Sequence, residues 1–326
     1  MLKIDVQSMP INVIITKDFD HLSVVAADMV KEKILQGLQK KKEFVLGLAT
    51  GNSPTILYKH LVKMFNSGEL DSSRIRSFNL DEYIGLPGEN SQQRVLNKES
   101  YCYFMIQEFF GLLKQKFIET SLPYGCLIDQ KQLIKELEAN PEDWSELGIN
   151  AGKSIVINEK PNSEYLNWIR KTILEEYAQK IENAGGIDLQ IIGVGGHGHV
   201  AFHESGIPFE NSSVLLVKLD DNTVENAVKD GHFLSKEDSP LYAISMGAEL
   251  VYKAKTVILL ANGDRKVESV TKSLLNDPSP AIPISYGQIY SDRGGDLIYI
   301  LDRIAGRGLI INKEVLKQKG IKIKEL

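Results

Sequence analysis

Cysteine is scarce in this chain of 326 residues, which has only Cys102 and Cys126. Two cysteines are too few for a disulfide framework and are not spaced like a zinc site, so we expect two reduced thiols. Charged residues interrupt the apolar ones throughout Met1–Leu35, which is not typical of a signal peptide. No later apolar run approaches the length of a membrane span. We therefore expect a cytoplasmic protein.

An excess of positive charge is also lacking, because 38 Lys and Arg residues stand against 43 Asp and Glu residues, for a net charge of −5. This balance disfavours nucleic acid or an anionic membrane as the main partner. A small molecule is the more reasonable partner, and an anionic one must be held by a few local donors. The hydrophobic fraction of 43% and the charged fraction of 25% are those of ordinary globular proteins.

Apolar runs of strand length alternate with longer amphipathic stretches, which is the pattern of repeated β-α-β units. The strand and helix pairs are Phe44–Leu48 with Ile56–Phe65, Ile75–Leu80 with Tyr101–Phe110, and Thr256–Asn262 with Lys266–Leu275; Ser213–Lys218 and Asp296–Leu301 are further strand candidates. The pattern predicts an α/β fold: an open, largely parallel twisted sheet with helices on both faces, Rossmann-like in architecture.

The length allows either one large domain or two smaller ones. The segment Ser121–Pro161 fits the alternation poorly, because it is polar, contains three prolines and offers one short helix, around Lys131–Glu138. A composition change this mild does not establish a second domain. We predict a single domain over residues 1–326, with a peripheral insertion at 121–161.

The densest group of polar side chains follows an apolar strand at Leu189–Val194. Glycines after this strand allow a sharp turn, and the turn carries His197, His199, His203 and Glu204 to the carboxyl edge of the sheet, where α/β proteins bind ligands. Histidines two apart can bind Zn²⁺, with the carboxylate as a ligand or a base. The other interpretation is a histidine acid–base oriented by Glu204. It is favoured because no second cluster of metal ligands follows.

A second strand, within Leu46–Pro54, ends in a glycine turn that opens onto a helix. Backbone N–H groups and the helix dipole at such a junction bind anions, so a phosphate is the natural ligand. The alternative is a purely structural turn in which Ser53 caps the helix. The candidate phosphate-binding residues here are Thr50, Gly51, Asn52 and Ser53.

Two further strand ends carry charged residues. One ends on Asp81 and Glu82, which point to opposite faces, so that one can serve a site while the other serves structure. A partly desolvated carboxylate can act as a general base, although Asp is also a common turn residue. The other end places Lys266 at a helix start, where a cation opposes the helix dipole. A contact with the phosphate would explain that placement.

Together these segments resemble the glucosamine-6-phosphate deaminase (isomerase) family, within a wider group that includes 6-phosphogluconolactonases. The matching motifs occur in the family's order at Leu46–Pro54, Phe78–Pro87, Gly193–Glu204, Tyr242–Gly247 and Gly263–Lys266. The Asn-x-Asp-Glu-Tyr sequence and the Ala-Phe-x-Glu ending resemble the deaminase branch rather than the lactonase branch.

The resemblance implies an enzyme that converts an amino sugar 6-phosphate, such as glucosamine 6-phosphate, to a ketose phosphate and ammonia. By that resemblance, Asp81 would move a proton between C2 and C1 of the opened sugar, His199 would assist ring opening, and Glu204 would orient His199. The backbone of Gly51–Ser53 and the side chain of Lys266 would hold the phosphate. No metal or cofactor is implied, because proton transfer needs only a placed base and a polarised carbonyl. A homo-oligomer is compatible with this interpretation.

The chain departs from the family at three positions. His197, a further candidate catalytic residue, stands where the family usually has Asp, and an imidazole cannot stabilise an imidazolium at His199 as a carboxylate would. Lys218 and Lys229 are the candidates where the deaminases use arginines, and Lys does not replace a bidentate Arg. Loss of the first arginine argues against allosteric activation. Two alternatives stay open: a lactone hydrolase of the 6-phosphogluconolactonase type and a non-catalytic sugar-phosphate sensor.

Overall fold

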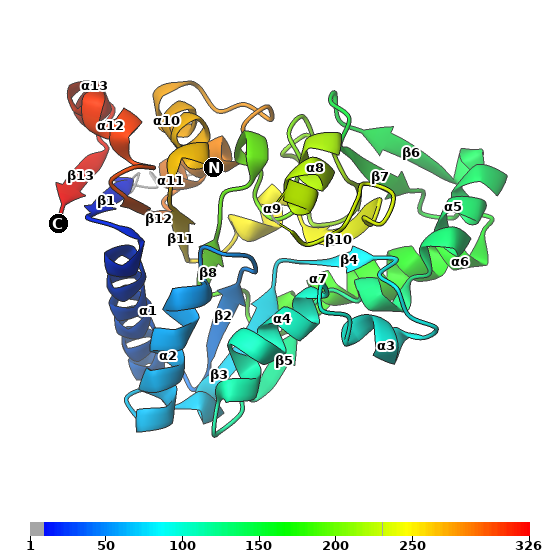
Figure 1. Ribbon diagram of the computed structural model, residues 1–326, viewed down its shortest axis with the longest axis horizontal. Helices are drawn as coiled ribbons and strands as arrows, with labels where there is room; N and C mark the ends of the chain where they lie inside the picture. The colour runs from blue at the N-terminus through cyan, green and yellow to red at the C-terminus, as the bar shows by residue number, and fades with distance from the viewer. Residues whose placement is uncertain (1–9, 230) are drawn as a thin grey trace, which may run out of the picture.

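A computed structural model describes residues 10–229 and 231–326, and within these residues eight parallel strands form the main sheet. Figure 1 shows these strands running through the left half of the molecule. In spatial order they are β13 (Lys322–Glu325), β1 (Asn12–Thr16), β12 (Asp296–Asp302), β11 (Thr256–Ala261), β8 (Leu189–Ile192), β2 (Phe44–Leu48), β3 (Ile75–Asn79) and β5 (Glu119–Ser121). The predicted parallel sheet is confirmed, and β2 has the predicted bounds.

Helices cover both faces of this sheet. The helices α1, α2 and α4 lie on one face, and α1 packs along α2 and β12 (Figure 1). The helices are α1 (Phe19–Lys40), α2 (Thr55–Ser67), α3 (Ser91–Val95), α4 (Tyr101–Glu108), α5 (Gln130–Ala139), α6 (Glu164–Trp168), α7 (Glu176–Asn183), α8 (Asp221–Lys229), α9 (Ala248–Val251), α10 (Val267–Leu275), α11 (Tyr286–Asp292), α12 (Arg307–Ile311) and α13 (Lys313–Gln318). No helix of the described residues is both long enough and apolar enough to span a membrane.

A second, antiparallel sheet lies beside the first and was not predicted. Its strands, in spatial order, are β4 (Asp81–Ile84), β10 (Tyr242–Met246), β9 (Val214–Lys218), β7 (Lys153–Ile157) and β6 (Trp144–Leu147). The chain passes from the first sheet to the second within one residue, because β3 ends at Asn79 and β4 begins at Asp81. The predicted strand at Ser213–Lys218 is therefore present, as β9 of this second sheet.

The segment at 121–161 contains α5, which confirms the predicted short helix, and it also supplies β6 and β7. These two strands form one edge of the second sheet, at the end of the molecule far from α1 and β13 (Figure 1). The segment thus contributes the two edge strands of the second sheet. The division of the chain into domains stays a prediction.

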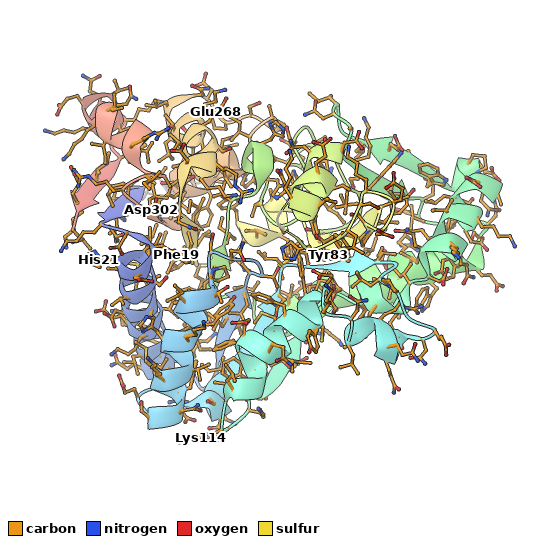
Figure 2. The ribbon with its side chains drawn as sticks, in the orientation of Figure 1. Phe19, His21, Tyr83, Lys114, Glu268 and Asp302 are labelled. Atoms are coloured by element: carbon orange, nitrogen blue, oxygen red, sulfur yellow. The ribbon has the colours of Figure 1, made fainter. Side chains whose placement is uncertain are left out.

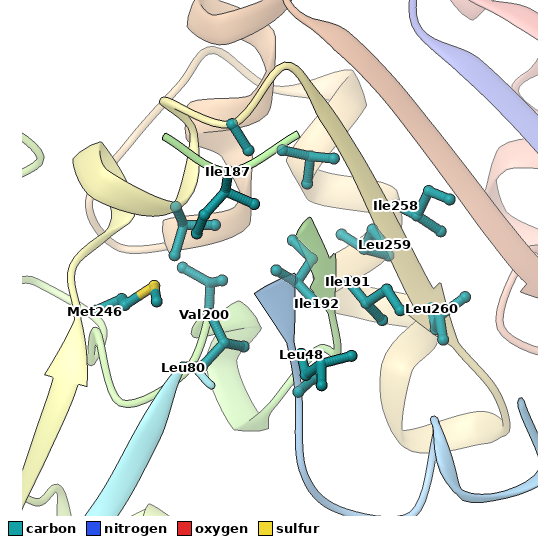
Figure 3. Close-up of a cluster of buried hydrophobic side chains, with 14 of the residues drawn as sticks. Leu48, Leu80, Ile187, Ile191, Ile192, Val200, Met246, Ile258, Leu259 and Leu260 are labelled. Atoms are coloured by element: carbon teal, nitrogen blue, oxygen red, sulfur yellow. The ribbon is translucent and has the colours of Figure 1, made fainter. Parts of the chain in front are cut away.

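The apolar core lies directly beneath the carboxyl ends of the central strands. Figure 3 shows Leu48 of β2, Ile191 of β8 and Leu259 of β11 packed together, with Leu80 and Met246 reaching them from the junction of the two sheets. All five side chains are buried. Burial of one such side chain stabilises the fold by roughly 1.5–3 kcal/mol, so the strand ends that carry polar residues are held by a rigid apolar layer.

Candidate active site

A cavity of about 500 Å³ opens at the carboxyl ends of β2, β3, β8 and β11. The crossover after β2 runs to β3 and the crossover after β8 runs to β11, in opposite directions along the sheet. This is the topological switch point at which open α/β sheets bind ligands. The cavity is lined by Thr50, Gly51, Asn52, Ser53, Asp81, Tyr101, Gly195, His199, Phe202, Asn262, Arg265 and Lys266, among others.

Asp81 lies at the first position of β4, with its carboxylate in this cavity. It is 5% exposed, and the Thr50 hydroxyl is its hydrogen-bond donor, at 3.5 Å from Oδ1. Burial, and then the negative charge of Glu82, raise the pKa of Asp81 to about 8, while the bond from Thr50 opposes the rise. A carboxylate with a pKa in this range is a stronger base than an ordinary aspartate. Thr50 thus contacts the predicted base.

His199 and Glu204 are brought together as predicted, with 3.0 Å between Nδ1 and Oε2. Glu204 is nearly fully buried, and its other oxygen accepts a hydrogen bond from the backbone N–H of Asp220 at 3.3 Å. Gly195 is needed beneath the ring, because a Cβ there would lie 1.5 Å from Nε2 of His199. The carboxylate therefore holds one ring nitrogen while the other lies over a glycine in the wall of the cavity.

The other two histidines of the motif have different surroundings. His203 is fully buried; its Nε2 lies 3.1 Å from the Ile207 carbonyl, and its Nδ1 accepts the Ala248 N–H at 3.0 Å. Burial lowers its pKa to about 4, so it is a neutral structural residue. His197 is exposed, has a left-handed backbone with φ 52°, and does not line the cavity that holds Asp81.

Two strand-end loops meet at the predicted phosphate site. The Ser53 hydroxyl donates to Oδ1 of Asn262 at 3.0 Å, which joins the loop after β2 to the loop after β11, and no side chain caps α2. The buried carboxylate of Asp302 accepts the Gly263 N–H at 3.1 and 3.0 Å, and Figure 2 shows Asp302 at the end of β12. These contacts fix the short loop that carries Lys266.

A second cavity of about 740 Å³ shares His199, Phe202, Lys266 and other wall residues with the first. His197 lines this second cavity, together with residues of α8 and α10. The predicted Lys218 and Lys229 line neither cavity.

Lys218, at the end of β9, lies 3.9 Å from Glu146 on the second sheet. Lys229, at the end of α8, lies 3.7 Å from Glu225 on the same helix. Neither lysine is therefore placed to bind a phosphate held at Lys266.

Several lining residues were missed by the sequence interpretation. Tyr101 and Phe202 form part of the wall of both cavities and stack on each other, with ring centroids 5.8 Å apart and planes 7° apart. Arg265 and Asn262 flank the predicted Lys266 loop. For Phe202, the Ala-Phe-x-Glu motif was the one available sequence signal. For Tyr101 no motif was available, because this residue begins a helix that comes 20 residues after Asp81. In the described part of the chain, no three His, Cys, Asp or Glu side chains group as they would around a metal ion.

The curated relatives decide the family. The chain is 31% identical over 297 residues to a glucosamine-6-phosphate deaminase of Clostridium acetobutylicum, covering 91% of this chain and 99% of the relative. It is 32% identical over 306 residues to one of a Thermoanaerobacter species, covering 94% and 97%. The chain belongs to the glucosamine-6-phosphate deaminase family. It is accordingly an enzyme, although no family model matches it.

Solved structures agree with this membership. A monomeric glucosamine-6-phosphate deaminase superposes with a TM-score of 0.67 at 26% identity, covering 90% of this chain and 98% of that one. The 6-phosphogluconolactonase of Trypanosoma brucei superposes with a TM-score of 0.56 at 14% identity, covering 93% and 100%. The second likeness shows a common fold alone. The family resemblance found in the sequence motifs is therefore confirmed.

Proposed function

We propose that the protein is an amino sugar 6-phosphate isomerase and deaminase that converts glucosamine 6-phosphate and water to fructose 6-phosphate and ammonia. The observation that carries the proposal is the meeting of a base, a histidine–glutamate pair and a cationic loop in one cavity of about 500 Å³, at Asp81, His199 and Lys266. A volume of this size accommodates a small ligand such as a hexose phosphate. We expect the enzyme to work in the cytoplasm.

The sugar would be anchored by its phosphate. Lys266 supplies positive charge, and the turn at Gly51–Ser53 supplies backbone N–H groups at the start of α2. The Ser53–Asn262 hydrogen bond holds these two loops together, so the phosphate subsite is preformed. A preformed anchor orients the other end of the sugar toward Asp81.

Ring opening would use His199. In its neutral form the imidazole takes the proton of the C1 hydroxyl and returns a proton to the ring oxygen, and so opens the ring to the aldehyde. The 3.0 Å contact with Glu204 fixes the ring orientation and stabilises the imidazolium that forms between the two transfers. We assign no step to His197, because it lines the neighbouring cavity.

Isomerisation and deamination would follow at Asp81. Its carboxylate removes the proton from C2 while the C1 oxygen takes a proton from the ammonium group of the substrate, which gives an enolamine. The protonated Asp81 then returns its proton to C1, which gives an iminium at C2. Water then adds to the iminium carbon, and ammonia leaves as the C2 carbonyl forms. Each transferred proton is accounted for within this sequence. The raised pKa of Asp81 suits the abstraction of a weakly acidic C–H proton.

The test is an assay of product identity. Purified protein is incubated with glucosamine 6-phosphate, with unphosphorylated glucosamine and with 6-phosphogluconolactone, and ammonia, ketose phosphate and ring-opened acid are measured. Equimolar ammonia and fructose 6-phosphate from the first substrate only is the expected result. Lactone opening without ammonia release from any substrate would replace this proposal with a lactonase.

A further inference from the structure

Glu82, the second carboxylate of the Asp81–Glu82 pair, lines neither cavity. It is 1% exposed, and each of its oxygens accepts two hydrogen bonds. Oε1 accepts the backbone N–H groups of Tyr83 at 2.9 Å and Tyr101 at 3.0 Å. Oε2 accepts the Ser100 hydroxyl at 2.8 Å and the Cys102 N–H at 2.9 Å. A buried carboxylate with four donors is a rigid anchor.

Three of these donors belong to the start of α4, where backbone N–H groups have no partner within the helix. The chain between β4 and α4 is a long excursion that includes only the short α3. Glu82 therefore connects the first turn of α4 directly to the strand that carries Asp81. An anion is well suited to this place, because it also meets the positive end of the helix dipole.

The first residue of α4 is Tyr101, which forms part of the wall of both cavities. Its ring stacks on Phe202 and its hydroxyl lies 3.5 Å from that of Tyr83, which Figure 2 labels near the centre of the molecule. The backbone N–H of Tyr101 is itself one of the four donors to Glu82. The hydrogen bond to Glu82 thus holds the backbone from which the Tyr101 ring extends.

We propose that Glu82 is a positioning residue that acts through Tyr101: its carboxylate fixes the first turn of α4 and so holds the Tyr101 ring in the wall of the cavity that contains Asp81. The proposal rests on the proposed function for its substrate. Tyr101 would contact the bound sugar, whereas Glu82 would not. Glu82→Gln tests this most directly, because each Glu82 oxygen accepts two hydrogen bonds. The NH₂ group of glutamine replaces one of these oxygens and cannot accept either bond.

A double-mutant cycle tests this coupling. Glu82→Gln is expected to raise KM for glucosamine 6-phosphate about 10-fold while kcat changes less than 3-fold, since the cavity wall shifts but the base remains. Tyr101→Ala should raise KM at least as much, and the double variant should be no worse than Tyr101→Ala alone. Additive effects in the double variant would overturn the proposal.

A second readout separates positioning from a loss of folded protein. Burial, and then the charge of Glu82, raise the pKa of Asp81, so the acidic limb of kcat/KM should move to lower pH in Glu82→Gln. A smaller fraction of folded protein would lower the rate at every pH and leave the limb in place. An unmoved limb in Glu82→Gln would contradict the arrangement. If Glu82→Gln does not fold, Ser100→Ala is the alternative, because it removes one hydrogen-bond donor to Glu82. Ser100→Ala should raise KM about 2-fold to 3-fold in the native background and should leave KM unchanged in the Tyr101→Ala background.

Binding measurements keep this inference separate from the proposed reaction. Calorimetric binding of fructose 6-phosphate to Asp81→Asn, with and without Glu82→Gln and Tyr101→Ala, needs no turnover. A non-additive loss of affinity supports the coupling even if the native enzyme releases no ammonia, in which case only the proposed function fails. Equal affinity in all variants overturns the coupling, whatever the reaction proves to be.

Discussion

Gly152, between β6 and β7, packs directly against Glu204, the carboxylate partner of His199. A Cβ at position 152 would lie 2.7 Å from Cβ of Glu204. The Gly152 N–H also donates to Asp220 at 3.2 Å, and the Asp220 N–H donates to Glu204. Through Gly152, the segment at 121–161 therefore forms one side of the surroundings of the His199–Glu204 pair.

Gly152→Ala should displace Glu204 and weaken its contact with His199. We expect kcat to fall on the order of 10-fold, since small displacements of a catalytic group are costly. The free energy of unfolding should fall by about 1–3 kcal/mol from overpacking. Steady-state kinetics and urea unfolding measure the two effects. Ser145→Ala, at an exposed position of β6, is the control, and an unchanged kcat in folded Gly152→Ala would contradict this account.

Asp302→Asn should loosen the loop that carries Lys266, because Asp302 holds the Gly263 N–H and also accepts the Ala305 N–H at 2.7 Å. We expect KM for the sugar phosphate to rise about 10-fold with little change in kcat, since the phosphate anchor contributes uniform binding. Initial-rate kinetics test this split. The exposed Asp292→Asn is the matched control. A fall in kcat with KM unchanged would argue against an anchoring role.

The stability of the fold should depend on His203 at acidic pH. Its pKa is about 4 in the folded protein and about 6.5 in the unfolded chain, so only the unfolded state takes up a proton between these values. The contribution of His203 to the free energy of unfolding therefore decreases as pH falls from 6.5 to 4, by about 3 kcal/mol at most.

Urea unfolding at pH 7.5 and pH 4.5 measures this dependence in the native protein and in His203→Gln. The native protein should lose more stability than the variant between the two values. His60→Gln, on α2, is the control and should behave like the native protein. Equal losses in native protein and His203→Gln would show that this histidine is not buried in a neutral form.

The buried Asp81 should decrease the free energy of unfolding at neutral and mildly alkaline pH. Its folded pKa of about 8 lies above the usual value of 3.8, so the folded state holds a proton that the unfolded chain has released. Stability is lost as pH rises from about 4 to about 8, and Asp81→Asn avoids that loss. We expect this variant to be more stable than the native protein by about 5 kcal/mol at pH 8 and by about 2 kcal/mol at pH 5. A less stable variant at pH 8 would contradict the raised pKa.

The inner strands of the main sheet, β2, β3, β8, β11 and β12, were predictable because they are largely buried on both faces, and β2 and β8 also end in glycine turns. The strands β1, β5 and β13 were not predicted, because they are short and partly exposed. Because the ends of the inner strands could be predicted, Asp81, His199 and Lys266 could be assigned to the carboxyl edge of the sheet from the sequence alone. The second sheet was not predictable, because β4 pairs with β10 far along the chain and both strands are short. Local sequence also could not place Lys218 and Lys229, since the side of an element that faces a cavity depends on packing.

Ammonia release from glucosamine 6-phosphate, compared between the native protein and Asp81→Asn, tests the central claim most directly. The carboxamide has nearly the shape of the carboxylate but cannot take a proton from C2. We predict equimolar ammonia and fructose 6-phosphate from the native protein, and a loss of at least about 10³-fold in kcat for the variant, with sugar-phosphate binding retained. Undiminished ammonia release by folded Asp81→Asn would contradict the assignment of Asp81 as the base.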